Sequence, residues 1–222
     1  VYKNNEWEYG YRENDELGGY DPYSASKAAV EILVSSWSSS FLNKNNLSDI
    51  NLKIATVRSG NVIGGGDWAS NRIVPDCARA IISKKPLIIK NPNSHRPWLH
   101  VLETLRGYII LIEKMSSSNK NNLETYNFGP LIQNNKSVKE LVEKINKFWP
   151  FEYIISDNNS TFHETKLLHL NSDKAYNDLK WFQQWNFEKT IFRTINWYKL
   201  CNEGMDPLEL CLQDIKDYNE VK

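Results

Sequence analysis

The segment that most constrains this chain is DPYSASK, which occupies residues 21–27 near its beginning. Asp21 is a favourable N-cap and Pro22 suits the first position of a helix, so a helix is predicted to begin here. On a helix, Tyr23 and Lys27 share one face. A lysine ammonium beside a phenol can lower the pKa of that phenol and let it accept a proton near neutral pH. The pair therefore suits the deprotonation of an alcohol while a hydride leaves the same carbon.

The spacing of Tyr23 and Lys27 is common by itself, and an exposed helical pair is the alternative interpretation. The three small residues between them favour catalysis, because they leave room for a flat cofactor ring. Hydride chemistry on such a pair requires a nicotinamide, which normally lies on a Gly-rich turn between a strand and a helix. Only 22 residues precede Tyr23, and the chain starts with Val1. We therefore expect the NAD-binding half to be cropped, lost or separately encoded.

The composition excludes several classes of function. The chain has 222 residues, 41% of them apolar, and its 27 basic and 27 acidic residues leave no net charge. No global field attracts it to nucleic acid or an anionic membrane, and no apolar run approaches membrane-spanning length. Three widely spaced cysteines are typical of free thiols in a reducing, cytoplasmic setting. The aromatic residues near the C-terminus are expected to pack in the core rather than to stack on nucleic acid: Trp181, Trp185, Trp197 and Tyr198.

Strand and helix patterns alternate along the chain, which predicts an α/β architecture. The short β-branched run at 52–57 is typical of a buried parallel strand. Further strands are expected at 87–90, 125–128 and 151–156, with polar loops at 1–20 and 157–163. Helices are expected at 21–41, 73–83, 103–115, 137–149, 172–179 and 187–201, with a last one after Pro207.

A second motif, RSGNVIGGGDW, follows the first predicted strand at residues 58–68. Its glycines suggest a phosphate-binding loop, but no Lys-Ser/Thr pair follows them. Its position is more informative, because open α/β sheets bind ligands at the carboxyl ends of their parallel strands. Asn61 would offer an amide there and Gly60 an approachable backbone. A flexible connector is the alternative.

Two arginines and a histidine are candidate contacts for a diphosphate or a base. Arg72 and Arg96 carry planar guanidinium groups that suit bidentate binding of phosphate. His100 follows Arg96 in the same segment. Either arginine taken alone is more typical of a surface charge. The remaining histidines show no ligand spacing, so no metal site is predicted: His95, His163 and His169.

Taken together, these segments resemble the extended short-chain dehydrogenase/reductase family, and within it most closely the CDP-glucose 4,6-dehydratases. The resemblance covers essentially the whole chain. The GGGDW phrase at 64–68 and the RPWLHV phrase at 96–101 favour these dehydratases over sister enzymes that share only the Tyr-Lys pair. The other phrases that carry the resemblance lie at residues 1–4, 18–28, 58–63, 91–95, 126–130, 172–175 and 179–181.

The resemblance implies an enzyme that uses tightly bound NAD to oxidise C4 of CDP-glucose, eliminates water across C5–C6 and returns the hydride to C6. Tyr23 would be the base for the C4 hydroxyl. Lys27 would bind the nicotinamide ribose and lower the pKa of Tyr23, with Val62 beside the nicotinamide. The substrate-side residues implied are Asn61 at the phosphate or sugar, Arg72 and Arg96 at the nucleotide diphosphate, Asn127 near the nucleotide, and His163 and Glu164 along the substrate. Family members dimerise through helices that include the Tyr-Lys helix, so a homodimer is expected.

The sequence departs from the family pattern at its start. The Gly-rich NAD turn, the acidic ribose-binding residue and the Thr-Asp-Lys-type dehydration segment have no counterpart in it. We therefore expect the C-terminal part of a Rossmann-type parallel sheet over residues 1–85. Residues 86–222 would form mainly the smaller α/β nucleotide-sugar-binding region, interleaved with that sheet. The chain alone should be inactive or nearly so, with one sheet edge and apolar helix faces exposed.

Two alternatives remain open. The chain could be a related nucleotide-sugar dehydratase or epimerase that acts on a GDP-, dTDP- or UDP-sugar, and comparing its binding of those sugars with that of CDP-glucose would distinguish them. It could also be a non-catalytic nucleotide-sugar-binding or complementing subunit that pairs with a separately encoded NAD-binding half.

Overall fold

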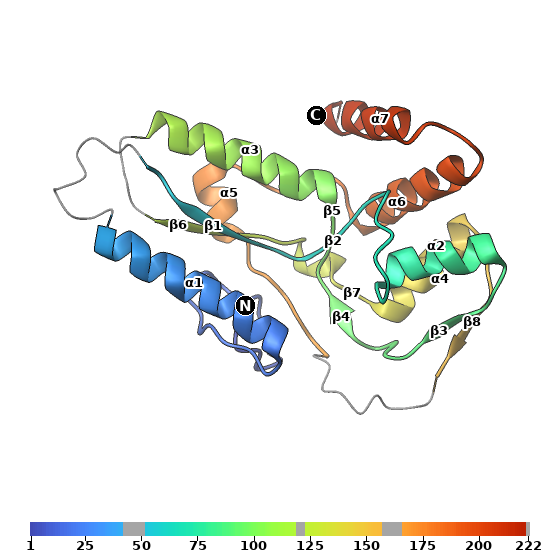
Figure 1. Ribbon diagram of the computed structural model, residues 1–222, viewed down its shortest axis with the longest axis horizontal. Coiled ribbons are helices and arrows are strands. Elements are labelled where there is room, and N and C mark those ends of the chain that lie inside the picture. The colour runs from blue at the N-terminus through green and yellow to red at the C-terminus, as the bar shows by residue number, and fades with distance from the viewer. Residues whose placement is uncertain (42–51, 119–122, 157–165, 221–222) are drawn as a thin grey trace.

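Helices and strands alternate along the chain in the computed structural model, which describes residues 1–41, 52–118, 123–156 and 166–220 (Figure 1). The helices are α1 (Pro22–Phe41), α2 (Ile73–Ser83), α3 (Val101–Ser117), α4 (Val138–Phe148), α5 (Asp173–Leu179), α6 (Phe187–Asn202) and α7 (Pro207–Asn219), with a 3-10 turn η2 (Ile132–Asn134). The strands are β1 (Ala55–Ser59), β2 (Asn61–Ile63), β3 (Leu87–Ile89), β4 (His95–Arg96), β5 (Trp98–His100), β6 (Glu124–Phe128), β7 (Lys136–Ser137) and β8 (Tyr153–Ile155). The predicted α/β class is confirmed. No helix within the described ranges has the length and apolar composition that crossing a bilayer requires.

The strands associate in pairs, and most pairs are parallel. β1 and β6 run parallel, with Ala55 opposite Glu124 and Ser59 opposite Phe128. β2 pairs with β5 and β3 pairs with β8, also in parallel, whereas β4 and β7 are antiparallel. Among the described residues β1 pairs with β6 alone. The second edge of β1 therefore has no partner strand in this part of the chain.

Local sequence signals place the helices where they are predicted. α1 begins at Pro22, and Asp21 Oδ1 accepts a hydrogen bond of 3.0 Å from the N–H of Ser24. Ser137 and Glu140 form a reciprocal capping box at the start of α4. These signals connect residues three positions apart, so they act before any tertiary contact forms. That is why the sequence alone locates these helix starts.

Several short strands and bridges are not predicted from the sequence. Residues 61–63, expected in a loop, form β2, and β4 and β5 are unexpected as well. The predicted loop at 1–20 is tied into the fold by bridges from Tyr2 to Leu17 and from Tyr11 to Leu170. Strands of two or three residues are too short to show a periodic pattern of apolar residues. Their partners, which lie far away in the chain, decide whether they form.

The buried apolar side chains form two clusters. One joins β1, β6, α3 and α5 around Tyr126, Phe128 and Trp181. The other joins α2, α4 and α6 around Ile145 and Ile191. Both clusters draw on segments before and after residue 85, so the predicted division of the chain at that residue stays a prediction. The expected burial of the C-terminal aromatic residues is confirmed for Trp181, Trp185, Trp197 and Tyr198.

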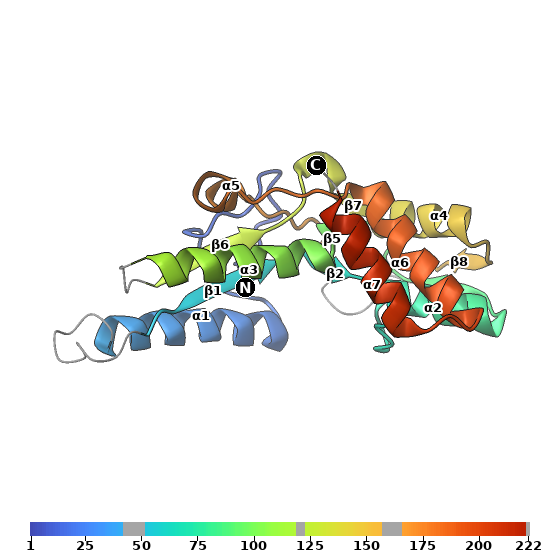
Figure 2. The same cartoon turned by 90° about the horizontal axis from the view of Figure 1, so that it is seen from above.

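Helix α1 packs on the rest of the chain through a narrow face. Figures 1 and 2 show it running beside the β1–β6 pair. Ala28, Glu31 and Ser38 are its buried residues. Its apolar side chains at four other positions are 42% to 68% exposed: Val30, Ile32, Leu33 and Trp37. The prediction of an exposed apolar helix face is therefore confirmed for α1.

Candidate functional site

The predicted Tyr-Lys pair lies on the accessible side of α1. The Lys27 ammonium lies over the Tyr23 ring, 5.6 Å from its centroid, as expected for residues four positions apart on a helix. Tyr23 is 73% exposed. The Asp21 carboxylate accepts hydrogen bonds from the N–H and the hydroxyl of Ser24, at 3.0 and 2.6 Å. This cap fixes the first turn of α1, so the phenol and the ammonium are presented together to solvent.

A pocket of about 620 Å³ opens beside the first turn of α1. Its walls come from the N-terminal segment at 1–5, from residues 16–21 and from Ser24 of α1. Arg58 and Ser59, at the carboxyl end of β1, also line it. The pocket therefore lies where open α/β sheets bind their ligands.

A buried polar network that the sequence does not predict lies beneath α1. Arg58 of β1 forms a two-point ion pair with Glu31 of α1, with distances of 2.9 Å from Nε to Oε1 and 3.1 Å from Nη2 to Oε2. Arg58 Nη1 also donates to the Tyr2 hydroxyl at 2.7 Å. That hydroxyl donates to Asn127 Oδ1 of β6 at 2.7 Å. The network thus joins α1, both strands of the β1–β6 pair and the N-terminal segment.

The groups in this network keep one protonation state at neutral pH. Burial alone would raise the pKa of Glu31, but the hydrogen bonds and charge of Arg58 lower it overall. Burial raises the pKa of the Tyr2 hydroxyl, which therefore remains a donor. The sequence did contain a signal for Arg58, because a charged residue inside a buried strand requires a buried partner.

Gly60 is the point at which the chain leaves β1, which pairs with β6, and enters β2, which pairs with β5. Its N–H donates to the carbonyl oxygen of Phe128 at 3.1 Å, and the N–H of Asn61 donates to that of Pro97 at 2.8 Å. A Cβ atom on Gly60 would lie 2.2 Å from the Pro97 oxygen, so only glycine permits this approach. Asn61 and Val62 therefore follow directly after the carboxyl end of a parallel strand, as predicted from their position in the sequence.

The two predicted phosphate-binding arginines lie on different elements. Arg72 immediately precedes α2, and its exposed side chain pairs with Asp67, with 3.1 Å between Nη1 and Oδ2. Arg96 lies in β4 opposite Lys136 of β7. Its Nη1 donates to the backbone oxygen of His95 at 2.9 Å. Binding of phosphate by either arginine stays a prediction.

Comparison with known proteins identifies the family to which the chain belongs. Residues 6–129 match the model of the NAD dependent epimerase/dehydratase family. The chain belongs to this family. The match covers α1 with its Tyr-Lys pair, the β1–β6 pair, strand β2 with Asn61, and the connection that carries Arg72.

Similarity to individual proteins supports the family assignment. A CDP-glucose 4,6-dehydratase of Salmonella typhimurium is 40% identical over 218 residues, which are 98% of this chain and 61% of that protein. The crystal structure of dTDP-glucose 4,6-dehydratase from Bacillus anthracis in complex with NAD has a TM-score of 0.70 at 22% identity, over 90% of this chain and 58% of that one. A UDP-glucuronic acid 4-epimerase from Bacillus cereus, in complex with UDP-glucuronic acid and NAD, has a TM-score of 0.72 at 16% identity, over 86% and 57%. The chain thus resembles CDP-glucose 4,6-dehydratase, as the sequence predicts, and spans about three fifths of the length of these proteins.

Asn127, which the family resemblance places near the nucleotide, is fully buried in this chain. Its side-chain amide donates to the backbone oxygens of Tyr11 and Asn171 at 2.8 and 3.2 Å. Since its Oδ1 also accepts from Tyr2, the whole amide group is engaged within the protein. A role at the nucleotide stays a prediction, and it would have to act through these neighbours.

The remaining candidate residues from the sequence are His100, His163 and Glu164. His100 is buried and accepts the N–H of Leu102 at 3.3 Å, so it caps α3. Burial and the nearby Arg193 lower the pKa of His100 to about 3. It is therefore neutral at neutral pH and has a structural role in this chain, and its contact with a diphosphate or a base stays a prediction. His163 and Glu164 lie outside the described residues. Within the described ranges, no group of three or more His, Cys, Asp or Glu residues is placed to hold a metal ion.

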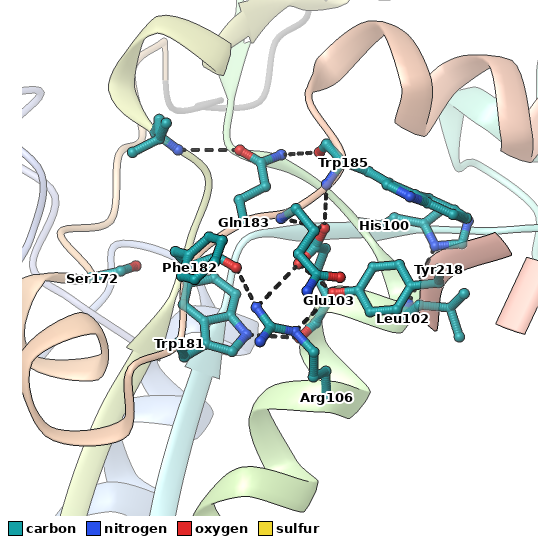
Figure 3. A network of polar contacts seen from close by, with 12 residues as sticks. His100, Leu102, Glu103, Arg106, Ser172, Trp181, Phe182, Gln183, Trp185 and Tyr218 are labelled. Atoms are coloured by element: carbon teal, nitrogen blue, oxygen red, sulfur yellow. Dashed lines mark hydrogen bonds and ion pairs between the residues drawn. The ribbon is translucent and has the colours of Figure 1, made fainter. Parts of the chain in front are cut away.

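A second buried network fixes the turn that precedes α6 (Figure 3). Glu103 of α3 is fully buried. Its Oε1 accepts hydrogen bonds from the N–H groups of Gln184 and Trp185, at 2.8 and 2.6 Å. Its Oε2 accepts the hydroxyl of Tyr218 from α7 at 2.6 Å. One carboxylate thus ties α3 to the turn at 181–185 and to α7, which makes this network structural.

Proposed function

We propose that these 222 residues form the proton-handling and nucleotide-sugar-binding side of a 4,6-dehydratase that converts CDP-glucose to CDP-4-keto-6-deoxyglucose. The observation that carries this proposal is the 40% identity to a CDP-glucose 4,6-dehydratase over 98% of the chain. The accessible Tyr-Lys pair beside a pocket at the carboxyl end of β1 supports it.

In this proposal Tyr23 takes the proton of the sugar C4 hydroxyl. The Lys27 ammonium, 5.6 Å from the centre of the phenol ring, would place a positive charge beside the group that takes this proton. Lys27 would also hold the nicotinamide ribose, with Val62 beside the ring. NAD, when bound, would supply the hydride acceptor for oxidation at C4 and the hydride donor for C6.

The residues present fit only the nicotinamide end of NAD. Tyr23 and Lys27 are accessible on α1, and Val62 is 37% exposed at the carboxyl side of the parallel strands. The sequence contains no Gly-x-x-Gly-x-x-Gly or Gly-x-Gly-x-x-Gly turn for the diphosphate of NAD. We therefore expect weak NAD binding by this chain and little or no turnover of CDP-glucose.

The nucleotide sugar would bind through groups on three elements. Arg72 before α2 and Arg96 in β4 would hold the diphosphate, because guanidinium groups match phosphate oxygens. Asn61 would contact the phosphate or sugar. The remaining residues assigned to the substrate side are Asn127, His163 and Glu164. A homodimer and a cytoplasmic location stay predictions.

Titration calorimetry with the chain as it stands tests the proposal. CDP-glucose should bind at least about tenfold more tightly than GDP-, dTDP- or UDP-glucose, which corresponds to about 1.4 kcal/mol. Arg96→Ala should weaken CDP-glucose binding, whereas Lys139→Ala, on an exposed face of α4, should not. Preference for another nucleotide sugar would identify a related dehydratase or epimerase. Efficient turnover of CDP-glucose with added NAD would refute the expectation of an inactive chain.

A further inference from the structure

The connection between β2 and α2, residues 64–72, is a partly exposed loop whose glycine content would leave its backbone free to move without contacts from other elements. It contains three consecutive glycines, and Gly66 and Asn71 have positive φ angles of 84° and 62°. Glycine-rich segments lose much backbone entropy when they adopt one conformation. Its conformation must therefore be held by contacts from elsewhere in the chain.

Helix α6 holds the first half of this loop. The hydroxyl of Tyr198 donates to the backbone oxygen of Asp67 at 2.5 Å. The backbone of Gly65 lies against the indole of Trp197, since a Cβ atom there would come within 2.1 Å of the ring. Tyr198 is fully buried, and burial raises its pKa to about 12. Its hydroxyl is thus a rigid donor that stays protonated at neutral pH.

Helix α2 holds the middle of the loop. Arg79 donates from Nη1 to the backbone oxygen of Trp68 at 2.8 Å and from Nη2 to that of Ala69 at 3.0 Å. The Trp68 ring meets the ring of Tyr198 edge on, with centroids 5.1 Å apart and an interplanar angle of 83°. Contacts from two helices therefore converge on the backbone of residues 67–69.

The residue held by these contacts is also the partner of Arg72. Asp67 Oδ1 accepts the N–H of Ala69 at 2.9 Å, and Asp67 Oδ2 pairs with Arg72 Nη1 at 3.1 Å. We propose that Tyr198 is a positioning residue for Arg72, acting through Asp67, and that α6 thereby sets the affinity of the site for a nucleoside diphosphate. This inference rests on the proposed function, which assigns the diphosphate to Arg72.

Calorimetric binding of CDP and of cytidine to the full chain tests this inference, because the two probes differ only in the diphosphate. Arg72→Ala should weaken CDP binding at least about tenfold, as expected when a charge-assisted hydrogen bond is lost, and leave cytidine binding unchanged. Tyr198→Phe should weaken CDP binding several-fold, again without changing cytidine binding. Arg79→Gln, which removes the other anchor, should act in the same direction.

A double substitution separates positioning from general destabilisation. In the Arg72→Ala background, Tyr198→Phe should cause no further loss of CDP affinity, because its effect passes through Arg72. Tyr126→Phe removes another tyrosine hydroxyl, one that lies 3.0 Å from Lys114 Nζ, and serves as the matched control. It should lower stability without changing the ratio of CDP to cytidine affinity.

Two contrary results are distinguishable. If Arg72→Ala weakens CDP binding but Tyr198→Phe does not, or if the two effects add in the double variant, the positioning role is wrong and the proposed function stands. If the unsubstituted chain does not bind CDP, or if Arg72→Ala leaves CDP binding unchanged, the assignment of the diphosphate to Arg72 fails, and the inference fails with it.

Discussion

Glu31 and Arg58 form a buried two-point ion pair that joins the Tyr-Lys helix to strand β1. Their side chains are only 10% and 6% exposed, although most of α1 faces solvent. Glu31 lies one turn beyond Lys27 in α1. The placement of Tyr23 and Lys27 relative to the carboxyl end of β1 therefore depends on this contact.

Replacing Glu31 should destabilise the chain strongly. Glu31→Gln removes one partner of a buried ion pair and leaves the Arg58 charge uncompensated, which costs about 3–5 kcal/mol. Urea denaturation at neutral pH measures the loss. The exposed pair of Lys3 and Glu16 supplies the control, since Glu16→Gln should cost less than about 1 kcal/mol. Equal effects of the two substitutions would contradict the structural role of the buried pair.

The hydroxyl of Tyr218 should stabilise α7. Tyr218→Phe removes the hydrogen bond of 2.6 Å to the buried Glu103 carboxylate. Hydrogen bonds to charged groups contribute about 1.5–3 kcal/mol, so the free energy of unfolding should fall by about that amount. Tyr176→Phe, at an exposed position of α5, should leave it nearly unchanged. A loss confined to Tyr218→Phe in thermal or urea denaturation would support the network.

Asp214 should make stability fall as pH rises between about 4 and 6. Burial raises its pKa to about 6, although the charges of Arg193 and Lys189 oppose the shift. An unfolded aspartate titrates near pH 3.9, so in this window the folded chain binds more protons than the unfolded chain. The free energy of unfolding therefore decreases with rising pH, by up to about 3 kcal/mol.

The variant Asp214→Asn isolates this contribution. It cannot titrate, so its stability should vary less with pH over the same window in urea denaturation. The slope that remains would belong to other groups, among them Glu103, whose pKa burial also raises. Identical pH profiles for the two proteins would show that the Asp214 carboxyl is not responsible.

Gly60 should not tolerate a side chain. Gly60→Ala would place a Cβ atom 2.2 Å from the Pro97 backbone oxygen, which accepts the N–H of Asn61. Because backbone atoms must move to relieve the overlap, we expect a loss of about 1–3 kcal/mol in the free energy of unfolding. Ser36→Ala, at an exposed position of α1, should stay within about 0.5 kcal/mol of the unsubstituted chain. A Gly60→Ala variant of unchanged stability would contradict the close approach.

The features that the sequence predicts well are those with local causes. The start of α1 at Pro22, the capping box of Ser137 and Glu140, and the shared face of Tyr23 and Lys27 all involve residues three or four positions apart. The short strands are missed because their partners are distant, as in the pairing of β2 with β5. The contact of His100 with Trp185 is missed for the same reason, since only the fold places the two rings together, with centroids 4.7 Å apart.

The sequence by itself determined the α/β class, most helices and the family resemblance, because each of these depends on local periodicity or on short sequence motifs. Only the tertiary structure decided that Arg58 pairs with Glu31, that Asn127 is fully engaged inside the protein, and that Tyr198 holds the loop before Arg72. The physical reason is burial. A buried polar group must find partners wherever the folded chain brings them, and those partners lie 27 residues from Arg58, 125 from Asn127 and 131 from Tyr198.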